Sequence, residues 1–183
     1  MRTELNKTAL VGASLNAENA VQAVTDAKLA HYPESEKIAW AMAAVIHCDF
    51  CRLFIAYEEC EREGFARLLW MADISSKLYE ARNWYNNAGT KLLKEIASTK
   101  ACEVSEINKK IDSLKSTHKI HRVNRYEDYR NKLGYHYDEN ATSYLQKFGG
   151  EDANAFFEIL SSFVKFSGEW AQLTKSLIKT NAR

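Results

Sequence analysis

Apolar residues recur at the spacing of an α-helix along most of this 183-residue chain. The pattern predicts long helices over about 35–62, 65–96 and 105–134, and a last one with an apolar stripe from Phe156 to Leu177. A shorter helix, with Asn16 as its N-cap, is predicted over 16–31. Four long amphipathic helices and a few short ones predict an all-α helical bundle. No repeat or linker divides the chain, so residues 1–183 are expected to form one domain.

Three local patterns refine this outline. The segment 35–62 has a wide apolar arc, which predicts a largely buried helix. Asn86-Asn87-Ala88-Gly89 predicts a kink or an end midway through the third segment. Residues 97–104 are small and polar and predict a connection between helices.

Composition is that of an ordinary globular protein, with 46% hydrophobic and 27% charged residues. One proline and seven glycines leave few helix breakers. The chain has no signal-like segment and no apolar run of membrane-spanning length, so we expect a cytoplasmic protein without a membrane partner. In that compartment the four cysteines stay reduced.

The net charge is +1, so any attraction to nucleic acid must be local. Residues 105–136 carry eight bases and four acids, which is +4 and leaves −3 for the rest of the chain. Bases interleaved with aromatic rings are typical of single-stranded nucleic-acid binding. Charge alone is also consistent with a helix face that is exposed to solvent and binds no nucleic acid. The predicted RNA-binding residues are Lys119, Arg122, Arg125, Tyr129 and Tyr135.

Arg130 lies on a helical stripe that otherwise reads as apolar, with Val123, Tyr126 and Leu133. A guanidinium on such a face needs a partner, because an unpaired buried charge is costly. The partner is either a carboxylate from another helix or an anion in a cleft or subunit interface. Helical spacing leaves both open.

The run Arg130-Asn131-Lys132-Leu133-Gly134-Tyr135-His136 resembles the Arg-x(4–6)-His motif of HEPN proteins (higher eukaryotes and prokaryotes nucleotide-binding). It is most similar to the abortive-infection branch, in which a polar residue follows the arginine and an acid such as Asp138 follows the histidine. The similarity covers about residues 129–138. An all-helical fold is compatible with it over the whole chain.

The resemblance implies a HEPN-like bundle that dimerises and cleaves RNA without a metal or another cofactor. His136 would transfer a proton, since an unperturbed histidine titrates near ~6.5. Arg130 would neutralise charge on the phosphate. Asn131 would orient the histidine or bind the phosphate. An antitoxin or regulatory protein is a further partner, although Asp138 stands where antitoxin-modified relatives often carry tyrosine.

The spacing of Arg130 and His136 constrains the site. Six residues of unbroken helix would set the two side chains ~120° and ~9 Å apart. Either the helix breaks at Gly134, or the two residues meet those of a second subunit. Both arrangements fit a composite site in a homodimer.

Other groupings carry weaker signals. Cys48 and Cys51 form a lone CxxC in a helix expected to be buried, where structural thiols are favoured over zinc ligands. His118 and His121 lack the glutamate of a His-Glu-x-x-His motif, so we expect them to be solvated or to face RNA. No metal site is therefore predicted. Besides a ribonuclease, a non-catalytic module that binds RNA, nucleotide or protein and an unrelated helical dimerisation scaffold remain open.

Overall fold

The computed structural model describes residues 2–60, 65–100, 102–127, 142–143, 146 and 153–179. Within these ranges the fold is all-α, as the sequence predicts. The α-helices are α1 (Arg2–Thr25), α2 (Glu34–Glu59), α3 (Phe65–Trp84), α4 (Thr90–Thr99), α5 (Val104–Thr117) and α8 (Ala153–Lys179). Shorter helical segments are η1 (Ala27–Leu29), η2 (Tyr85–Gly89) and η3 (Ile120–Tyr126).

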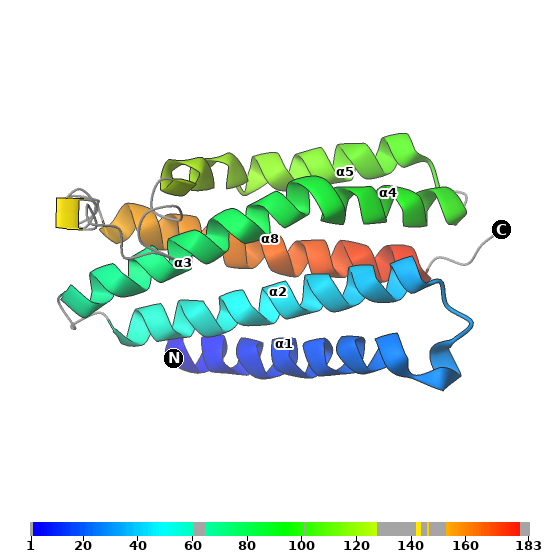
Figure 1. The fold of residues 1–183 in the computed structure, drawn as a ribbon, viewed down its shortest axis with the longest axis horizontal. Helices are drawn as coiled ribbons and strands as arrows, with labels where there is room; N and C mark the ends of the chain where they lie inside the picture. The colour runs from blue at the N-terminus through cyan, green and yellow to red at the C-terminus, as the bar shows by residue number, and fades with distance from the viewer. Residues whose placement is uncertain are drawn as a thin grey trace.

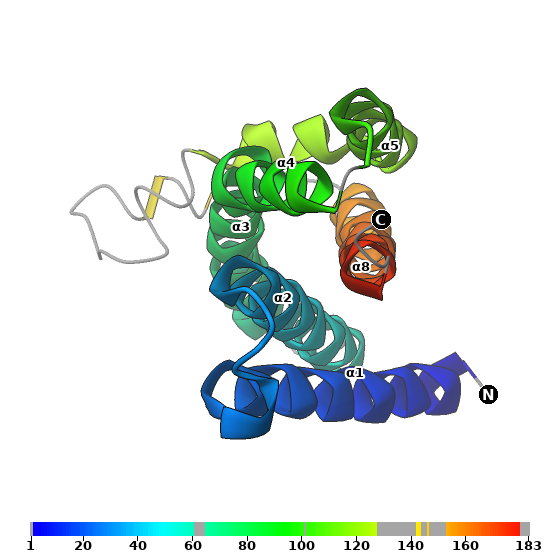
Figure 2. The same ribbon diagram turned by 90° about the vertical axis from the view of Figure 1, so that its right-hand side faces the viewer.

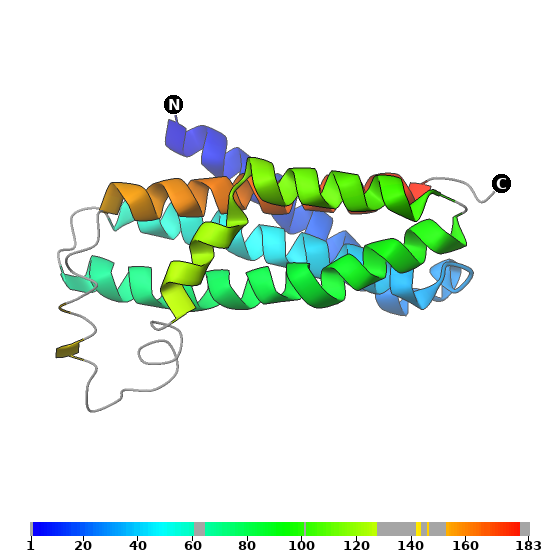
Figure 3. The same ribbon diagram turned by 90° about the horizontal axis from the view of Figure 1, so that it is seen from above.

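Most helices run close to the long axis of the molecule (Figure 1), while α1 crosses the others obliquely (Figure 3). Seen from one end, α1 lies below α2, while α3, α4, α5 and α8 lie on the other side of α2 (Figure 2). α8 contacts α2, α3, α4, α5 and η3. Its predicted apolar stripe is buried, except that Leu173 is partly buried, so α8 packs one face against most of the other helices.

Aromatic rings fill the core along α8. Tyr85 is fully buried, with its ring 4.8 Å from that of Phe166 and 4.9 Å from that of Trp170. Phe50 of α2 packs on Phe163 at 4.7 Å. Such contacts stabilise beyond the area that they bury, by about 0.5–1.5 kcal/mol each.

The first helix is longer than predicted. α1 begins at Arg2 instead of near residue 16, and Asn16 lies within it. Its buried face is made of alanines, including Ala17 and Ala20, which pack on Ala41 and Ala44 of α2. Alanine gives a weak apolar signal but allows close helix packing, so the pattern of large apolar residues missed the first half of α1.

The predicted kink in the third segment is confirmed, in the form of a π-helical turn at Tyr85–Gly89. The Thr90 hydroxyl donates to the Tyr85 carbonyl at 2.6 Å, which helps to satisfy the altered backbone. A Cβ atom at Gly89 would come within 2.8 Å of the Trp84 ring, so any other residue there would force that ring to move. The turn bends the chain between α3 and α4 (Figure 1).

The predicted single helix over 105–134 is wrong at its centre. α5 ends at Thr117, and Lys119 adopts the left-handed conformation with φ 48°. The chain then continues as η3, which leaves the line of α5 and crosses over α3 (Figure 3). This turn buries Ile120, Val123 and Tyr126 against the bundle, which a straight continuation of α5 would not achieve.

The expectation that no apolar run reaches membrane-spanning length is wrong for α2, which is long and apolar enough to cross a membrane, the one such helix in the part of the chain that the structure describes. Half of its apolar window is buried inside the bundle. A core helix of a soluble protein has the same length and composition, and the fold is compatible with a soluble protein.

Candidate functional site

The described part of the basic stretch, which we call the basic ridge, spans α5 and η3 and exposes most of its charged side chains. Lys109, Lys110, Lys119 and Arg125 are exposed, and Arg122 is half-buried. The acids Glu106, Asp112 and Glu127 are also exposed, and the Tyr79 hydroxyl donates to Glu127 at 2.8 Å. The ridge therefore carries both basic and acidic side chains, with bases in excess. Binding of an anion would depend on which bases have no acidic neighbour.

The turn between α5 and η3 is held by α8. The Ser162 hydroxyl donates to the His118 carbonyl at 2.9 Å. His118 Nε2 lies 3.1 Å from Glu169 Oε2, and the histidine side chain is only 8% exposed. The expectation that His118 is solvated or faces RNA is therefore wrong, because the turn folds its ring inward toward α8. His121 is exposed, as predicted.

The three predicted RNA-binding bases within the described residues differ in surroundings. Lys119 sits at the apex of the turn and forms no ion pair there with another described residue. Arg122 lies 3.8 Å from Glu158, so its charge is partly offset. Arg125 lies over the ring of Tyr126, 5.7 Å from its centroid. Among the described residues, Lys119 is thus the one of the three cations without a charged or aromatic partner.

η3 ends at Tyr126, whose buried ring packs on Phe156 at 5.5 Å. Val123 and Tyr126 are both buried, as the predicted apolar stripe requires. Five predicted site residues follow within ten positions and lie outside the described residues: Tyr129, Arg130, Asn131, Tyr135 and His136.

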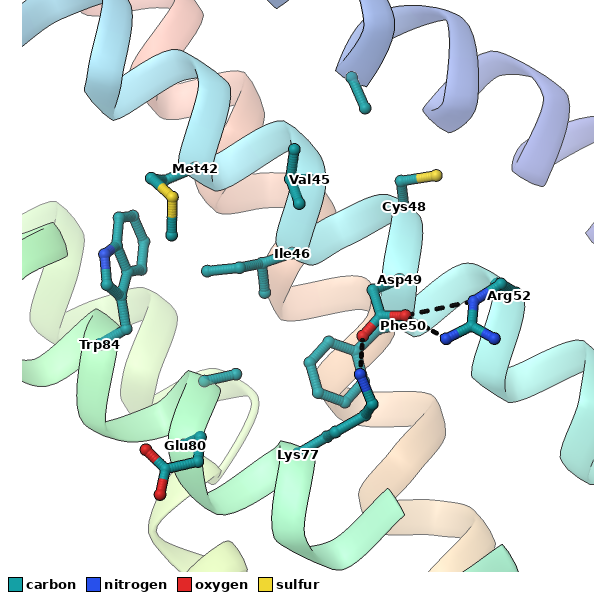
Figure 4. Close-up of a pocket in the computed structure, with 12 residues that line it drawn as sticks. Met42, Val45, Ile46, Cys48, Asp49, Phe50, Arg52, Lys77, Glu80 and Trp84 are labelled. Atoms are coloured by element: carbon teal, nitrogen blue, oxygen red, sulfur yellow. Dashed lines mark hydrogen bonds and ion pairs between the residues drawn. The ribbon is translucent and has the colours of Figure 1, made fainter. Parts of the chain in front are cut away.

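A second candidate site is an apolar cavity of about 600 Å³ on α2 and α3, bordered by Ala17 of α1 (Figure 4). Met42 is 37% and Val45 41% exposed at its mouth, and Trp84 lies on the α3 side. The sequence did not predict this site, because the wide apolar arc of α2 predicted a largely buried helix. The helix pattern carries no signal for which apolar positions lack a covering neighbour.

One end of this cavity is ionic. Asp49 accepts hydrogen bonds from Lys77 Nζ at 2.8 Å and Arg52 Nε at 3.2 Å (Figure 4). Burial acts to raise the pKa of Asp49, but the two cations outweigh it and lower that pKa below its ordinary value. Asp49 is therefore a charged anchor for its neighbours, and a poor general acid or base near neutral pH.

The cysteine motif is structural in character. Cys51 is buried, with its Sγ 3.6 Å from His47 Nε2, and burial raises its pKa to about 11. It is therefore a neutral thiol at physiological pH and not an activated nucleophile. Cys48 is half-buried at the cavity wall, and burial raises its pKa too. Among the described residues, no group of three His, Cys, Asp or Glu side chains is placed to hold a metal ion.

Comparison with protein-family models, curated proteins and solved structures finds no match to this chain. A function must therefore be argued from its own residues.

Proposed function

We propose that this protein is a cytoplasmic, metal-independent endoribonuclease of the HEPN type, acting as a toxin or phage-defence effector. The observation that carries the proposal is the run from Arg130 to His136, with its matching neighbours Asn131, Lys132 and Leu133. It follows directly on a basic ridge that ends at a residue fixed in the core, Tyr126.

The chemistry requires one proton-transfer group and one charge stabiliser. The ribose 2′-oxygen attacks the adjacent phosphorus as the bond from phosphorus to the 5′-oxygen breaks. The 2′-hydroxyl gives up its proton to a base, and the leaving 5′-oxygen gains one from an acid. His136 supplies proton transfer near neutral pH. Arg130 donates paired N–H groups to the phosphate oxygens as their charge grows, and Asn131 orients His136 or the phosphate.

RNA is held, in this proposal, by the cations before the motif and the rings within it. Lys119, Arg122 and Arg125 would contact phosphates, and Tyr129 and Tyr135 would stack on bases. The exposure of Lys119 and Arg125 supports this assignment. An antitoxin or other regulatory protein is a further expected partner.

The proposed active form is a homodimer in which Arg130 of one subunit works with His136 of the other. Mixing the Arg130→Ala and His136→Ala variants tests this. A mixed dimer has one site with both residues intact, so cleavage should return when two inactive variants are combined. Activity that stays absent in a verified mixed dimer would contradict the shared site.

Incubation of purified protein with total RNA and tRNA tests the function itself. Cleavage by the wild type and not by His136→Ala supports the ribonuclease. RNA binding without cleavage would instead identify a non-catalytic module, and the absence of both would leave a helical scaffold.

A further inference from the structure

Three half-buried cations lie where the bend between α3 and α4 faces α5, close enough that the charges of Arg82 and Lys94 act on Lys115. Figures 1 and 2 show α5 beside α4 at this level, and the two helices are in contact. None of the three residues belongs to the predicted RNA-binding set. They come from separate segments of the chain and are brought together by the fold.

The π-helical turn positions Lys115. Its Nζ donates to Thr90 Oγ1 at 3.1 Å, and the same hydroxyl donates to the Tyr85 carbonyl at 2.6 Å. Lys115 Nζ also lies 6.0 Å from the ring centroid of the buried Trp170. Turns of this kind often occur at functional sites. The ammonium is thus held by neutral groups.

The charges of the three residues act on one another. Burial lowers the pKa of Lys115, Asp112 partly opposes this, and the positive charges of Lys94 and Arg82 lower it further. Within the described residues none of the three cations forms an ion pair, and Arg82 Nε is buried without a hydrogen-bond partner. Clustered, partly desolvated cations whose charge is offset only in part, by Asp112, destabilise the free protein.

A bound anion would remove this penalty. Guanidinium and ammonium donors from three segments suit a phosphate, which accepts several charge-assisted hydrogen bonds at once. We infer that Arg82, Lys94 and Lys115 form a phosphate-binding site. This inference rests on the proposed function, in which the ligand is RNA, and the phosphate is therefore one of the RNA backbone. It binds apart from the Arg130–His136 motif. The bound RNA would then extend from η3 along α5 to the bend between α3 and α4.

The test compares the triple variant Arg82→Gln, Lys94→Gln, Lys115→Met with a matched control, Lys28→Gln, Lys91→Gln, Lys165→Gln. The control removes the same charge from exposed lysines without ion pairs to described residues. Binding of a labelled 2′-O-methyl RNA is measured over a range of salt. Because this RNA lacks the attacking hydroxyl, the measurement is independent of cleavage.

The site variant should raise Kd at low salt about tenfold or more beyond the control. Its salt dependence should flatten by about 0.7 in log–log slope for each phosphate that the variant no longer neutralises. A second readout uses inorganic pyrophosphate, which should raise the melting temperature of wild type and control but not of the site variant. Without phosphate the site variant should melt no lower than wild type, since repelling charges have been removed.

Each outcome decides a separate part of the inference. If pyrophosphate stabilises the wild type through these residues but RNA binding is unchanged, the site takes a small phosphate compound and the RNA assignment is overturned. If pyrophosphate has no effect and RNA binding equals that of the control, the phosphate site itself is overturned. Failure of Arg130 and His136 to support cleavage affects neither readout.

Discussion

Tyr126 at the end of η3 packs against Phe156 of α8, with ring centroids 5.5 Å apart and planes at 69°. The same Phe156 ring contacts Tyr57 of α2 at 5.1 Å. One phenylalanine thus joins α2, α8 and the segment that leads into Arg130. The chain enters the proposed catalytic motif from a fixed point in the core.

Replacement of Tyr126 by alanine should therefore lower the free energy of unfolding by about 3–5 kcal/mol, as for other large buried aromatics. Urea denaturation measures the change. Tyr32→Ala is the control, because Tyr32 is 38% exposed and its loss should change stability by less than about 0.5 kcal/mol. Equal effects of the two substitutions would show that Tyr126 does not anchor η3.

Lys119 holds the left-handed conformation at the turn before η3, with φ 48° and ψ 42°. This conformation strains any residue with a Cβ atom, and glycine adopts it freely. Lys119→Gly should be more stable than Lys119→Ala by about 0.5–1 kcal/mol, after the larger unfolded-state entropy of glycine is counted. Both variants lose the same charge, so a difference in denaturation midpoint reports the backbone alone. Identical midpoints would rule out strain at this turn.

His47 gives the fold a dependence on pH. The Ser167 hydroxyl donates to the Val164 carbonyl at 2.9 Å, so its oxygen can accept from His47 Nδ1, also at 2.9 Å. Nε2 is then left as an acceptor facing Cys51 Sγ. This arrangement suits the neutral ring, and burial lowers the pKa of His47 below its ordinary value of 6.5.

The unfolded chain therefore binds a proton at His47 more readily than the folded protein does, and stability should fall as pH drops below about 6.5. His47→Gln should reduce that fall between about pH 7 and 5. Ser167→Ala is the control, because it weakens the contact without removing the titrating ring. A pH dependence that survives His47→Gln unchanged would assign it to other groups.

The long apolar helices were predictable because their signal is local. The stripe of α8 and the interruption at Asn86–Gly89 both follow from residue type and spacing. The break at Lys119 was not predictable in this way. Neither glycine nor proline marks it. The one local sign of it is that Leu114 and Ile120 are six positions apart with no apolar residue between them, which moves the apolar stripe to another face without fixing where the helix ends. Burial of η3 against α3 and α8, a long-range effect, decides where α5 ends.

The candidate sites also differ in whether their signal is local in the sequence or arises only from folding. The Arg130–His136 motif is contiguous and can be recognised in the sequence, but its geometry lies outside the described residues. The cluster of Arg82, Lys94 and Lys115 is the reverse case, because residues from α3, α4 and α5 come near one another only through folding. Sequence spacing carries no signal for such a site.

The basic ridge, and not total charge, should control RNA affinity. Reversing Lys119, Arg122 and Arg125 to glutamate should weaken RNA binding sharply and flatten its salt dependence, because phosphate contacts release counter-ions. Reversal of Lys28, Lys91 and Lys165 changes the net charge equally and should have much less effect. Binding to 2′-O-methyl RNA measures both, and equal losses would leave the ridge without a special role.

The central claim is metal-independent cleavage by Arg130 and His136, and the reaction of purified protein with RNA in EDTA tests it most directly. The wild type should cut RNA in EDTA and leave 2′,3′-cyclic phosphate ends, while DNA and 2′-O-methyl RNA stay intact. His136→Ala should lose ~10²–10⁴-fold in rate, and Arg130→Ala ~10²–10³-fold, with folding retained. Cleavage that vanishes in EDTA and returns with zinc or magnesium would contradict the account.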